Sequence, residues 1–178
     1  MKRITHYISV IFSVLLLAGC GSDFTIPDTY TTYNAEGWSF SYPADWSLEE
    51  QTFHEDGTLF VTVPAEDEDV IPATIAIAPL SIDFDVEDIS YEGVLETIEE
   101  SFAGNGFQNV EGKVLKYPYG SVARVSGTSI TAQTELYLDQ MQHLREGHYY
   151  VATFTGTLGQ RDRLMKDIDL IYRSFTFE

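Results

Sequence analysis

The residue with the most distinctive chemistry in this sequence is Cys20, the single thiol among 178 residues. An apolar stretch from Ile8 to Leu17 lies shortly before it, and Lys2 and Arg3 put positive charge at the N-terminus. A transmembrane helix needs about 20 apolar residues, so this stretch is too short to span a bilayer. A basic start, a short apolar stretch and then small residues are typical of an export signal. We therefore expect the mature domain to lie outside the cytoplasm.

The tetrapeptide Leu17-Ala18-Gly19-Cys20 resembles a bacterial lipobox. The resemblance implies cleavage before Cys20 and diacylation of its thiol, which would anchor the chain to a membrane. A plain signal peptide with an incidental cysteine is the alternative. We therefore expect a lipoprotein signal peptide at residues 1–19, a lipidated cysteine with a flexible tether at 20–33, and a folded domain at 34–178. The exported domain has no second thiol, so it can form no internal disulfide.

Carboxylates are the first candidates for a metal site. Asp83, Asp85 and Glu87 alternate along the chain, so an extended segment would place all three on one side and could hold a cation weakly. Neither they nor the acidic run Glu66–Asp69 has the ligand spacing of a calcium-binding EF-hand loop. A solvated acidic loop is the alternative that the composition favours, and we predict no cofactor.

Histidines and catalytic motifs give no sign of an enzyme. After processing, His54, His143 and His148 remain, and their spacing lacks the paired pattern that zinc ligands need. His143 and His148 flank a predicted turn, which suggests ordinary solvent exposure. The sequence contains no Gly-x-Ser-x-Gly, His-Glu-x-x-His or Ser-x-x-Lys motif. We therefore predict a non-enzymatic protein.

Basic residues are concentrated near the C-terminus, on the polar face of a predicted helix. That face contains four of the eight basic residues that remain after processing, namely Arg161, Arg163, Lys166 and Arg173. Such a stripe could bind an acidic partner protein or lipid headgroups. The alternative is pairing with the protein's own carboxylates, for example Arg163 with Asp167 one turn later.

The overall charge excludes one class of partner. The chain has a formal net charge of −18, and loss of Lys2 and Arg3 with the signal peptide takes it to −20. Such a charge repels phosphate backbones and anionic lipid surfaces, so nucleic acid is not an expected partner. The membrane contact would be the lipid on Cys20.

Hydrophobic periodicity predicts the elements of the mature domain. Alternation predicts strands at 38–42, 59–63, 74–78, 110–117, 121–130 and 135–144, and a hairpin into a last strand at 149–156. The turn Pro43-Ala44-Asp45 predicts another short segment that begins at Trp46. Helical spacing predicts one helix ending near Phe102, with Asp88 or Ser90 as N-cap, and another whose apolar face includes Leu164 and Ile168. Strands and helices without strict alternation are typical of an α+β fold, an antiparallel sheet flanked by helices.

Several of these segments resemble a known family. They are "GWSFSYPADWS" at 37–47, "TIAIAPLS" at 74–81, the hairpin "YLDQMQHLREGHYYVATFTG" at 137–156 and "IYRSFTF" at 171–177, and together they resemble the PsbP/Mog-type superfamily, which includes DcrB-like bacterial lipoproteins. The resemblance implies an antiparallel sheet sandwiched by helices and a non-enzymatic accessory role. It favours a core role for Trp38, Phe40 and Trp46 over an aromatic ligand-binding patch.

Together these features predict a lipid-anchored lipoprotein on the extracytoplasmic side of the cell membrane or envelope. It would act as an accessory or interaction module that binds an envelope or membrane protein. Binding of a small ligand or of a divalent cation such as calcium is the alternative function.

Overall fold

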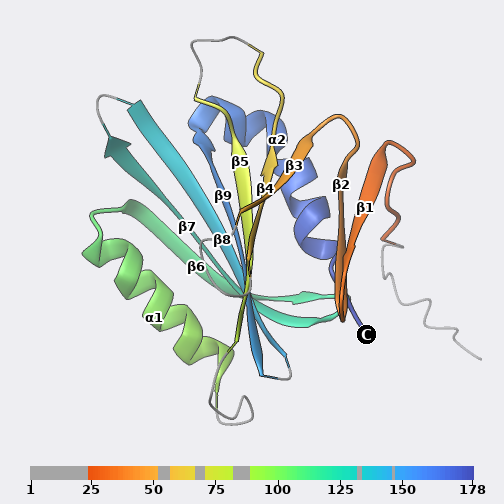
Figure 1. The fold of residues 1–178 in the computed structure, drawn as a ribbon. Helices are drawn as coiled ribbons and strands as arrows, with labels where there is room; N and C mark the ends of the chain where they lie inside the picture. Colours follow the sequence, from red (N-terminus) through yellow and green to blue (C-terminus); the bar gives the residue numbers. More distant parts are fainter. Residues whose placement is uncertain (1–23, 52–56, 67–70, 82–88, 132–133, 146) are drawn as a thin grey trace, which may run out of the picture.

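The computed structural model describes residues 24–51, 57–66, 71–81, 89–131, 134–145 and 147–178 (Figure 1). The elements follow in the order β1 (Tyr30–Ala35), β2 (Trp38–Pro43), β3 (Ser47–Gln51), β4 (Thr58–Thr62), β5 (Thr74–Ser81), α1 (Tyr91–Gly104), β6 (Gln108–Tyr117), β7 (Gly120–Thr131), β8 (Thr134–Arg145), β9 (His148–Thr157), α2 (Leu158–Arg173) and β10 (Thr176–Phe177). Among these described residues, no helix is long and apolar enough to cross a membrane.

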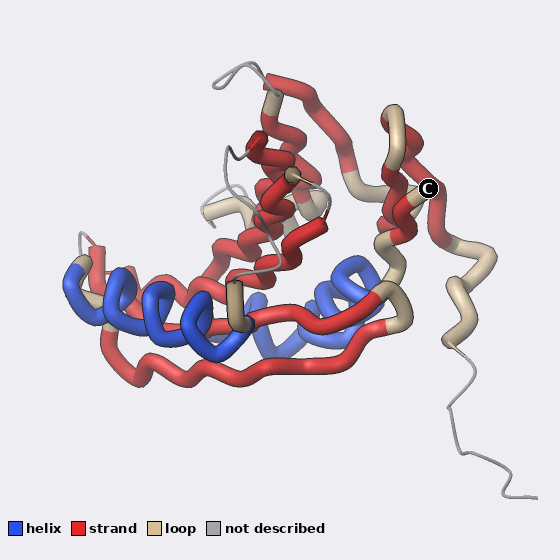
Figure 2. Tube along the Cα trace, turned by 90° about the horizontal axis from the view of Figure 1, so that it is seen from below, coloured by secondary structure: helices blue, strands red, loops and turns tan. Residues whose placement is uncertain are grey.

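The strands, drawn in red in Figure 2, form two antiparallel sheets. The larger has seven strands in the order β3-β4-β5-β9-β8-β7-β6, and the smaller has the order β1-β2-β10. The predicted hairpin is confirmed, since β8 and β9 pair from Leu136↔Thr157 down to Arg145↔His148. The pairing of β5 with β9 then joins the N-terminal and C-terminal halves of the large sheet.

Helix α1 covers one face of the large sheet. Of the two N-caps that the sequence allows, the structure has Ser90, whose hydroxyl accepts a 3.0 Å hydrogen bond from the Gly93 N–H. Asn105 caps the other end, and Gly106 then takes the left-handed conformation with φ +82°. The buried side of α1 packs against Ala123 and Val125 of β7.

Helix α2 covers the opposite face. Thr157 and Gln160 form a reciprocal capping box that fixes its start. Its buried residues Leu164, Ile168 and Tyr172 belong to the cluster that contains Val122 of β7. Successive strand residues point to opposite faces, so Val122 and Ala123 place the two helices on either side of the sheet. The α+β fold, an antiparallel sheet flanked by helices, is therefore confirmed (Figure 1).

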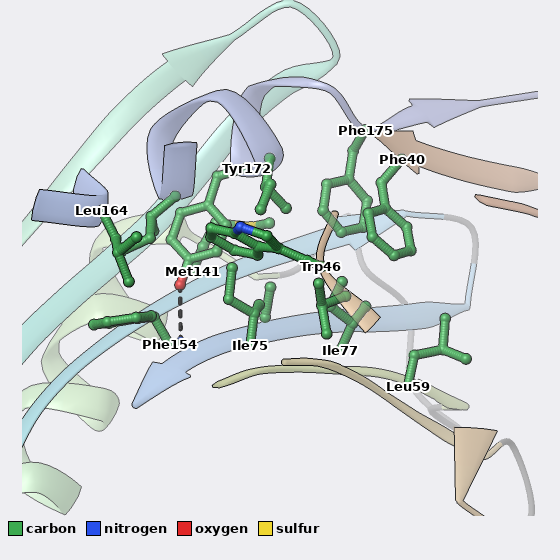
Figure 3. Packing of buried hydrophobic residues seen from close by; sticks show 14 of the residues in the cluster. Phe40, Trp46, Leu59, Ile75, Ile77, Met141, Phe154, Leu164, Tyr172 and Phe175 are labelled. Atoms are coloured by element: carbon green, nitrogen blue, oxygen red, sulfur yellow. Dashed lines mark hydrogen bonds between the residues drawn. The ribbon is translucent and has the colours of Figure 1, made fainter. Parts of the chain in front are cut away.

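The small sheet packs on the α2 side of the large one, through aromatic side chains. The rings of Trp38 and Phe175 stack at 5.9 Å between centroids, and Phe40 stacks on Phe175 at 5.5 Å. Figure 3 shows Phe40, Phe175 and Trp46 above Ile77 of the large sheet. Trp38, Phe40 and Trp46 are all buried, which agrees with the core role expected for them.

Two elements differ from the sequence-based expectation. Residues Tyr30–Tyr33, assigned to the flexible tether, lie in strand β1, which pairs with β2 over six residues. The ordered domain therefore begins before residue 34, because β1 gains its partners only when β2 lies beside it. Strand β10 was also not predicted; only Thr176 and Phe177 form it, opposite Ser39 and Trp38.

Candidate functional site

A cleft of about 500 Å³ opens between the two sheets, at the end of the molecule where the β1–β2 turn lies. Its wall is aromatic: Tyr33, Trp38, Tyr150 and Phe177 line it. These rings contact one another in a row, with centroid distances of 5.9 Å for Tyr33–Trp38, 5.7 Å for Trp38–Tyr150 and 4.8 Å for Tyr150–Phe177. The small sheet and β9 together thus give the cleft an aromatic wall, and its volume is typical of a binding pocket.

Charged side chains of both signs surround this wall. Glu36, Glu50 and Glu178 lie on the side of β1, β3 and β10, and all three are exposed. Arg145 and His148, at the β8–β9 turn, lie on the other side. The Arg145 guanidinium sits 5.5 Å from the centre of the Phe177 ring, within the range of a cation–π contact. The cleft can therefore hold a ligand that is part apolar and part charged.

Carboxylates influence the tyrosines of the small sheet. Burial, and then the neighbouring Glu50 carboxylate, raise the pKa of Tyr33 above its ordinary value. Burial, a hydrogen bond to Asp167 and the charge of Asp45 do the same to the pKa of Tyr30. Both hydroxyls therefore stay protonated at neutral pH and act as neutral hydrogen-bonding groups.

His143 lies beneath the cleft and is not a surface residue. It is only 4% exposed, which corrects the expected solvent exposure, whereas His148 is exposed as expected. Its Nδ1 lies 2.9 Å from the Ser121 carbonyl oxygen and 3.0 Å from the Tyr91 hydroxyl, and the rings of Tyr119 and Phe177 pack on it. Burial lowers the pKa of His143. It is thus a neutral packing residue at neutral pH.

A second group of charges lies between the large sheet and α2, and in it Arg124 and Asp139 are buried while Asp169 is partly exposed. The Arg124 guanidinium donates two hydrogen bonds of 2.8 Å to the Asp139 carboxylate and a third of 2.9 Å to Asp169. Tyr172 lies under the guanidinium, and its hydroxyl donates to the Asp139 carbonyl oxygen. The same hydroxyl accepts a hydrogen bond from the Phe154 N–H (Figure 3). We name Arg124, Asp139, Asp169 and Tyr172 the Arg124 cluster.

The charges of the Arg124 cluster satisfy one another. Burial alone lowers the pKa of the Arg124 guanidinium, but its hydrogen bonds and charge attraction with Asp139 outweigh this and raise it. Burial raises the pKa of the adjacent Tyr117 to about 12. Each of the three charges has a partner, so the cluster ties α2 to the sheet.

The predicted basic stripe on α2 forms contacts mainly within the protein. Arg163 pairs with Glu66, and not with Asp167 as the sequence suggested; the Asp167 carboxylate accepts the Tyr30 hydroxyl. Arg161 binds its neighbour Asp162 and covers the Tyr137 ring at 5.1 Å. A guanidinium nitrogen of Arg173 lies 3.8 Å from a carboxylate oxygen of Asp169. The fourth residue of the stripe, Lys166, is exposed. The stripe therefore has less charge to offer a partner than its sequence suggests.

The other predicted sites lie outside the described residues. These are Cys20, for lipidation, and Asp83, Asp85 and Glu87, for a cation. Within the described part of the chain, no group of three or more His, Cys, Asp or Glu side chains could hold a metal ion.

Comparison with solved structures identifies the fold. The solution structure of cyanobacterial PsbP (CyanoP) from Synechocystis sp. PCC 6803 superposes with a TM-score of 0.61 at 13% identity, covering 91% of this chain and 99% of that one. The fold is PsbP-like. The expected resemblance is thus confirmed at the level of the fold. No protein-family model and no curated protein matches the sequence.

Two further structures share this fold. One is the crystal structure of LpqN, described as involved in cell envelope biogenesis of Mycobacterium tuberculosis, with a TM-score of 0.54 and 17% identity over 83% of this chain and 90% of that one. The other is PA94 from Pseudomonas aeruginosa, a protein of unknown function and putative regulator, with a TM-score of 0.51 and 11% identity over 81% and 94% of the two chains. At these identities the likeness concerns the fold alone.

The cleft was not predicted from the sequence. Its lining residues come from β1, β2, β3, β4, β5, β8, β9, β10 and the segments beside them, so no local motif identifies it. One signal was present: Trp38 and Phe177, quoted above for their family resemblance, are aromatic residues that both line the cleft.

Proposed function

We propose that this chain is a lipid-anchored, extracytoplasmic lipoprotein that acts as a non-enzymatic accessory of the cell envelope by binding another protein. The cleft between the two sheets is the observation on which the proposal rests. Its aromatic wall gives apolar contact area, and charged residues at its rim give specificity, the combination found at protein-binding hot spots. The PsbP-like fold and the envelope role described for LpqN support a place in the cell envelope.

Anchoring at Cys20 would keep the cleft close to a membrane. The tether from Cys20 to Thr29 is ten residues, so it reaches at most about 35 Å when extended. A partner would then be a membrane protein or an envelope protein near the membrane surface. The strong negative charge of the chain opposes flat docking of the domain on anionic lipid.

The test is crosslinking in cells with the full chain. A photo-crosslinking amino acid replaces Glu36 at the cleft or, as the matched control, Lys166 on the exposed face of α2. We expect one dominant crosslinked protein from position 36, no such product from position 166, and loss of the product in a Cys20→Ala background. Equal products from both positions, or none from position 36, would contradict the proposal.

The second candidate function is binding of a small ligand in the same cleft, which its volume of about 500 Å³ supports. Binding of calcium at Asp83, Asp85 and Glu87, which lie outside the described residues, is a separate candidate that comes from the sequence. A ligand that binds only the folded state raises the melting temperature. A marked rise with millimolar calcium, reversed by chelation and absent in Asp83→Asn/Asp85→Asn, would favour the cation over the protein partner.

A further inference from the structure

Strand β1 is the outermost strand of the small sheet (Figure 1). Its sequence, Tyr-Thr-Thr-Tyr-Asn-Ala, has no charged residue and no proline. All six residues pair with β2 in continuous register, from Tyr30↔Pro43 to Ala35↔Trp38, without a bulge. The far side of such a regular, uncharged edge strand is a template on which another strand can pair.

The other edge strands have features that discourage pairing with an additional strand. Edge strand β3 includes Glu49 and Glu50 among its five residues. At the opposite edge, β6 has a register shift between Gln108 and Glu111 and exposes Lys113 and Lys116. Strand β10 is only two residues long. Charges, bulges and short length all discourage strand addition, so among the described strands β1 is the edge without such protection.

The charges around β1 indicate what kind of strand fits. Exposed Asp28 precedes it and exposed Glu36 follows it, while Asp45 acts on Tyr30 and Glu50 acts on Tyr33. In an antiparallel pair of two copies of this chain, Asp28 of one copy would approach Glu36 of the other. Like charges opposite each other destabilise a strand pair. A segment with Lys or Arg at its ends would be attracted instead.

The open edge adjoins the cleft. Tyr33 and Ala35 of β1 line the cleft, as does Glu50 of β3. Side chains alternate between the two faces of a strand, so every second side chain of a strand added to β1 would face the same side as Tyr33 and Ala35. Backbone pairing at the edge would then give affinity, and the cleft would select side chains.

We propose that the outer edge of β1 binds an extended, uncharged segment of a partner protein, flanked by Lys or Arg, as an additional antiparallel or parallel strand of the small sheet. This inference rests on the proposed function as an interaction module and specifies how the partner is recognised.

The probe is a pair of synthetic peptides with the same Thr-Val repeat core, one flanked by two Lys at each end and the other by two Glu. Each is added to the full chain, and amide hydrogen exchange is measured. We expect the Lys-flanked peptide to slow exchange in β1 and not in β3 or β6. The Glu-flanked peptide should bind at least about tenfold more weakly, a difference of about 1.4 kcal/mol.

Two proline variants test the edge itself. Backbone N–H groups alternate between the two sides of a strand, so one of Thr31→Pro and Thr32→Pro removes an outward N–H and leaves the pairing with β2 intact. The variant that loses the outward N–H is identified by its melting temperature, which should equal that of wild type. We expect it to bind the Lys-flanked peptide about tenfold more weakly, because one backbone hydrogen bond is lost and the ring blocks the approach.

A charge variant keeps the test decisive if both proline variants unfold. Asp28→Lys/Glu36→Lys changes only exposed positions, so it should fold, and it should reverse the preference between the two peptides. Wild-type affinity in the folded proline variant, an unchanged peptide preference, or protection of β3 or β6 alone would overturn the inference. So would a stable dimer crosslinked through β1, since the occupant would then be a second copy.

Failure of this inference is distinguishable from failure of the proposed function. If the folded proline variant retains the dominant partner crosslinked from position 36 in cells, edge pairing is wrong while the interaction module stands. If position 36 gives no partner in the wild-type chain, the proposed function itself fails.

Discussion

The Arg124 cluster and the cleft use charged residues in opposite ways. In the cluster, Arg124 and Asp139 are 8% and 2% exposed, and the two side chains meet through two hydrogen bonds of 2.8 Å. Around the cleft, Glu36 and Glu50 are exposed at the edge of an aromatic wall. Both regions lie on the same face of the large sheet, which α2 covers at one end and the small sheet at the other.

This comparison separates charges that stabilise the fold from charges that are available to a binding partner. A buried charge without its partner is costly, so the buried charges must be mutually satisfied before the core can close. An exposed carboxylate loses little hydration in the folded chain and can therefore still gain from a new partner. We expect substitutions in the cluster to change stability and substitutions at the cleft to change binding.

The largest effect should come from breaking the Arg124 cluster. Arg124→Met leaves the Asp139 carboxylate buried without its cation, which should cost about 3–5 kcal/mol of unfolding free energy. Urea denaturation followed by far-UV circular dichroism measures this. The double variant Arg124→Met/Asp139→Leu removes both charges and should be more stable than the single variant. A double variant as unstable as the single one would contradict the idea of a closed pair.

A smaller effect should follow from removing one hydroxyl in the same cluster. Tyr172→Phe keeps the ring beneath Arg124 but removes the group that joins the Asp139 carbonyl oxygen to the Phe154 N–H. Leaving buried backbone groups without a partner costs about 1–3 kcal/mol. The matched control is Tyr42→Phe, whose hydroxyl belongs to a partly buried residue outside the cluster. Similar losses in both variants would mean that the cluster is not the cause.

The buried histidine should produce a moderate dependence on pH. Its folded-state pKa is lowered from 6.5, so below that value the unfolded chain binds the proton more readily. The contribution of His143 to stability is therefore complete above pH 6.5 and declines as the pH falls through its lowered folded-state pKa. Tyr91, Tyr119 and Arg145 face it, and none of them supplies a negative charge at these pH values.

Comparing wild type with His143→Phe between pH 8 and pH 5 isolates this contribution from that of the carboxylates. The difference in urea midpoint between the two proteins should shift in favour of the variant as the pH falls. A constant difference across the range would mean that His143 is charged in both states or in neither.

The smallest effect on stability should come from the rim of the cleft. Glu50→Gln changes an exposed side chain, so the unfolding free energy should stay within about 0.5 kcal/mol of wild type. The partner crosslinked from position 36 should nevertheless be recovered in lower yield. Arg163→Ala on α2 is the control, since it breaks a surface ion pair worth at most about 1 kcal/mol and should leave the yield unchanged. The reverse pattern would place recognition on α2.

Local patterns predicted most of the elements but not how they assemble. Periodicity located both helices and eight of the ten described strands, because each of these has an apolar face or a clear turn beside it. Strand β1 was not predicted, because its Thr and Tyr residues form a distinct face only when they pack against β2. The two residues of β10 are too few for any pattern. The pairing of β5 with β9 depends on distant segments, which no local pattern encodes.

The same limit applies to the functional residues. His143 follows Gln142 in a hairpin strand, and its burial results from Phe177 and Tyr119, which lie far from it in sequence. The partners of the α2 stripe include Glu66, which is 97 residues away from Arg163. A sequence pattern identifies a charge, but the fold decides whether that charge is already neutralised.

The pairing of β10 with β2 also has a consequence for the order of folding. Ser39 and Ser41 contact Thr176 and Ser174, at separations of 137 and 133 residues. The first hairpin of the domain can therefore complete its sheet only after nearly the whole chain has been synthesised. Contacts this distant slow folding, since the chain must close a long loop before they form. We therefore expect the small sheet to be the last part of the fold to close, when residues 174–177 dock on β2.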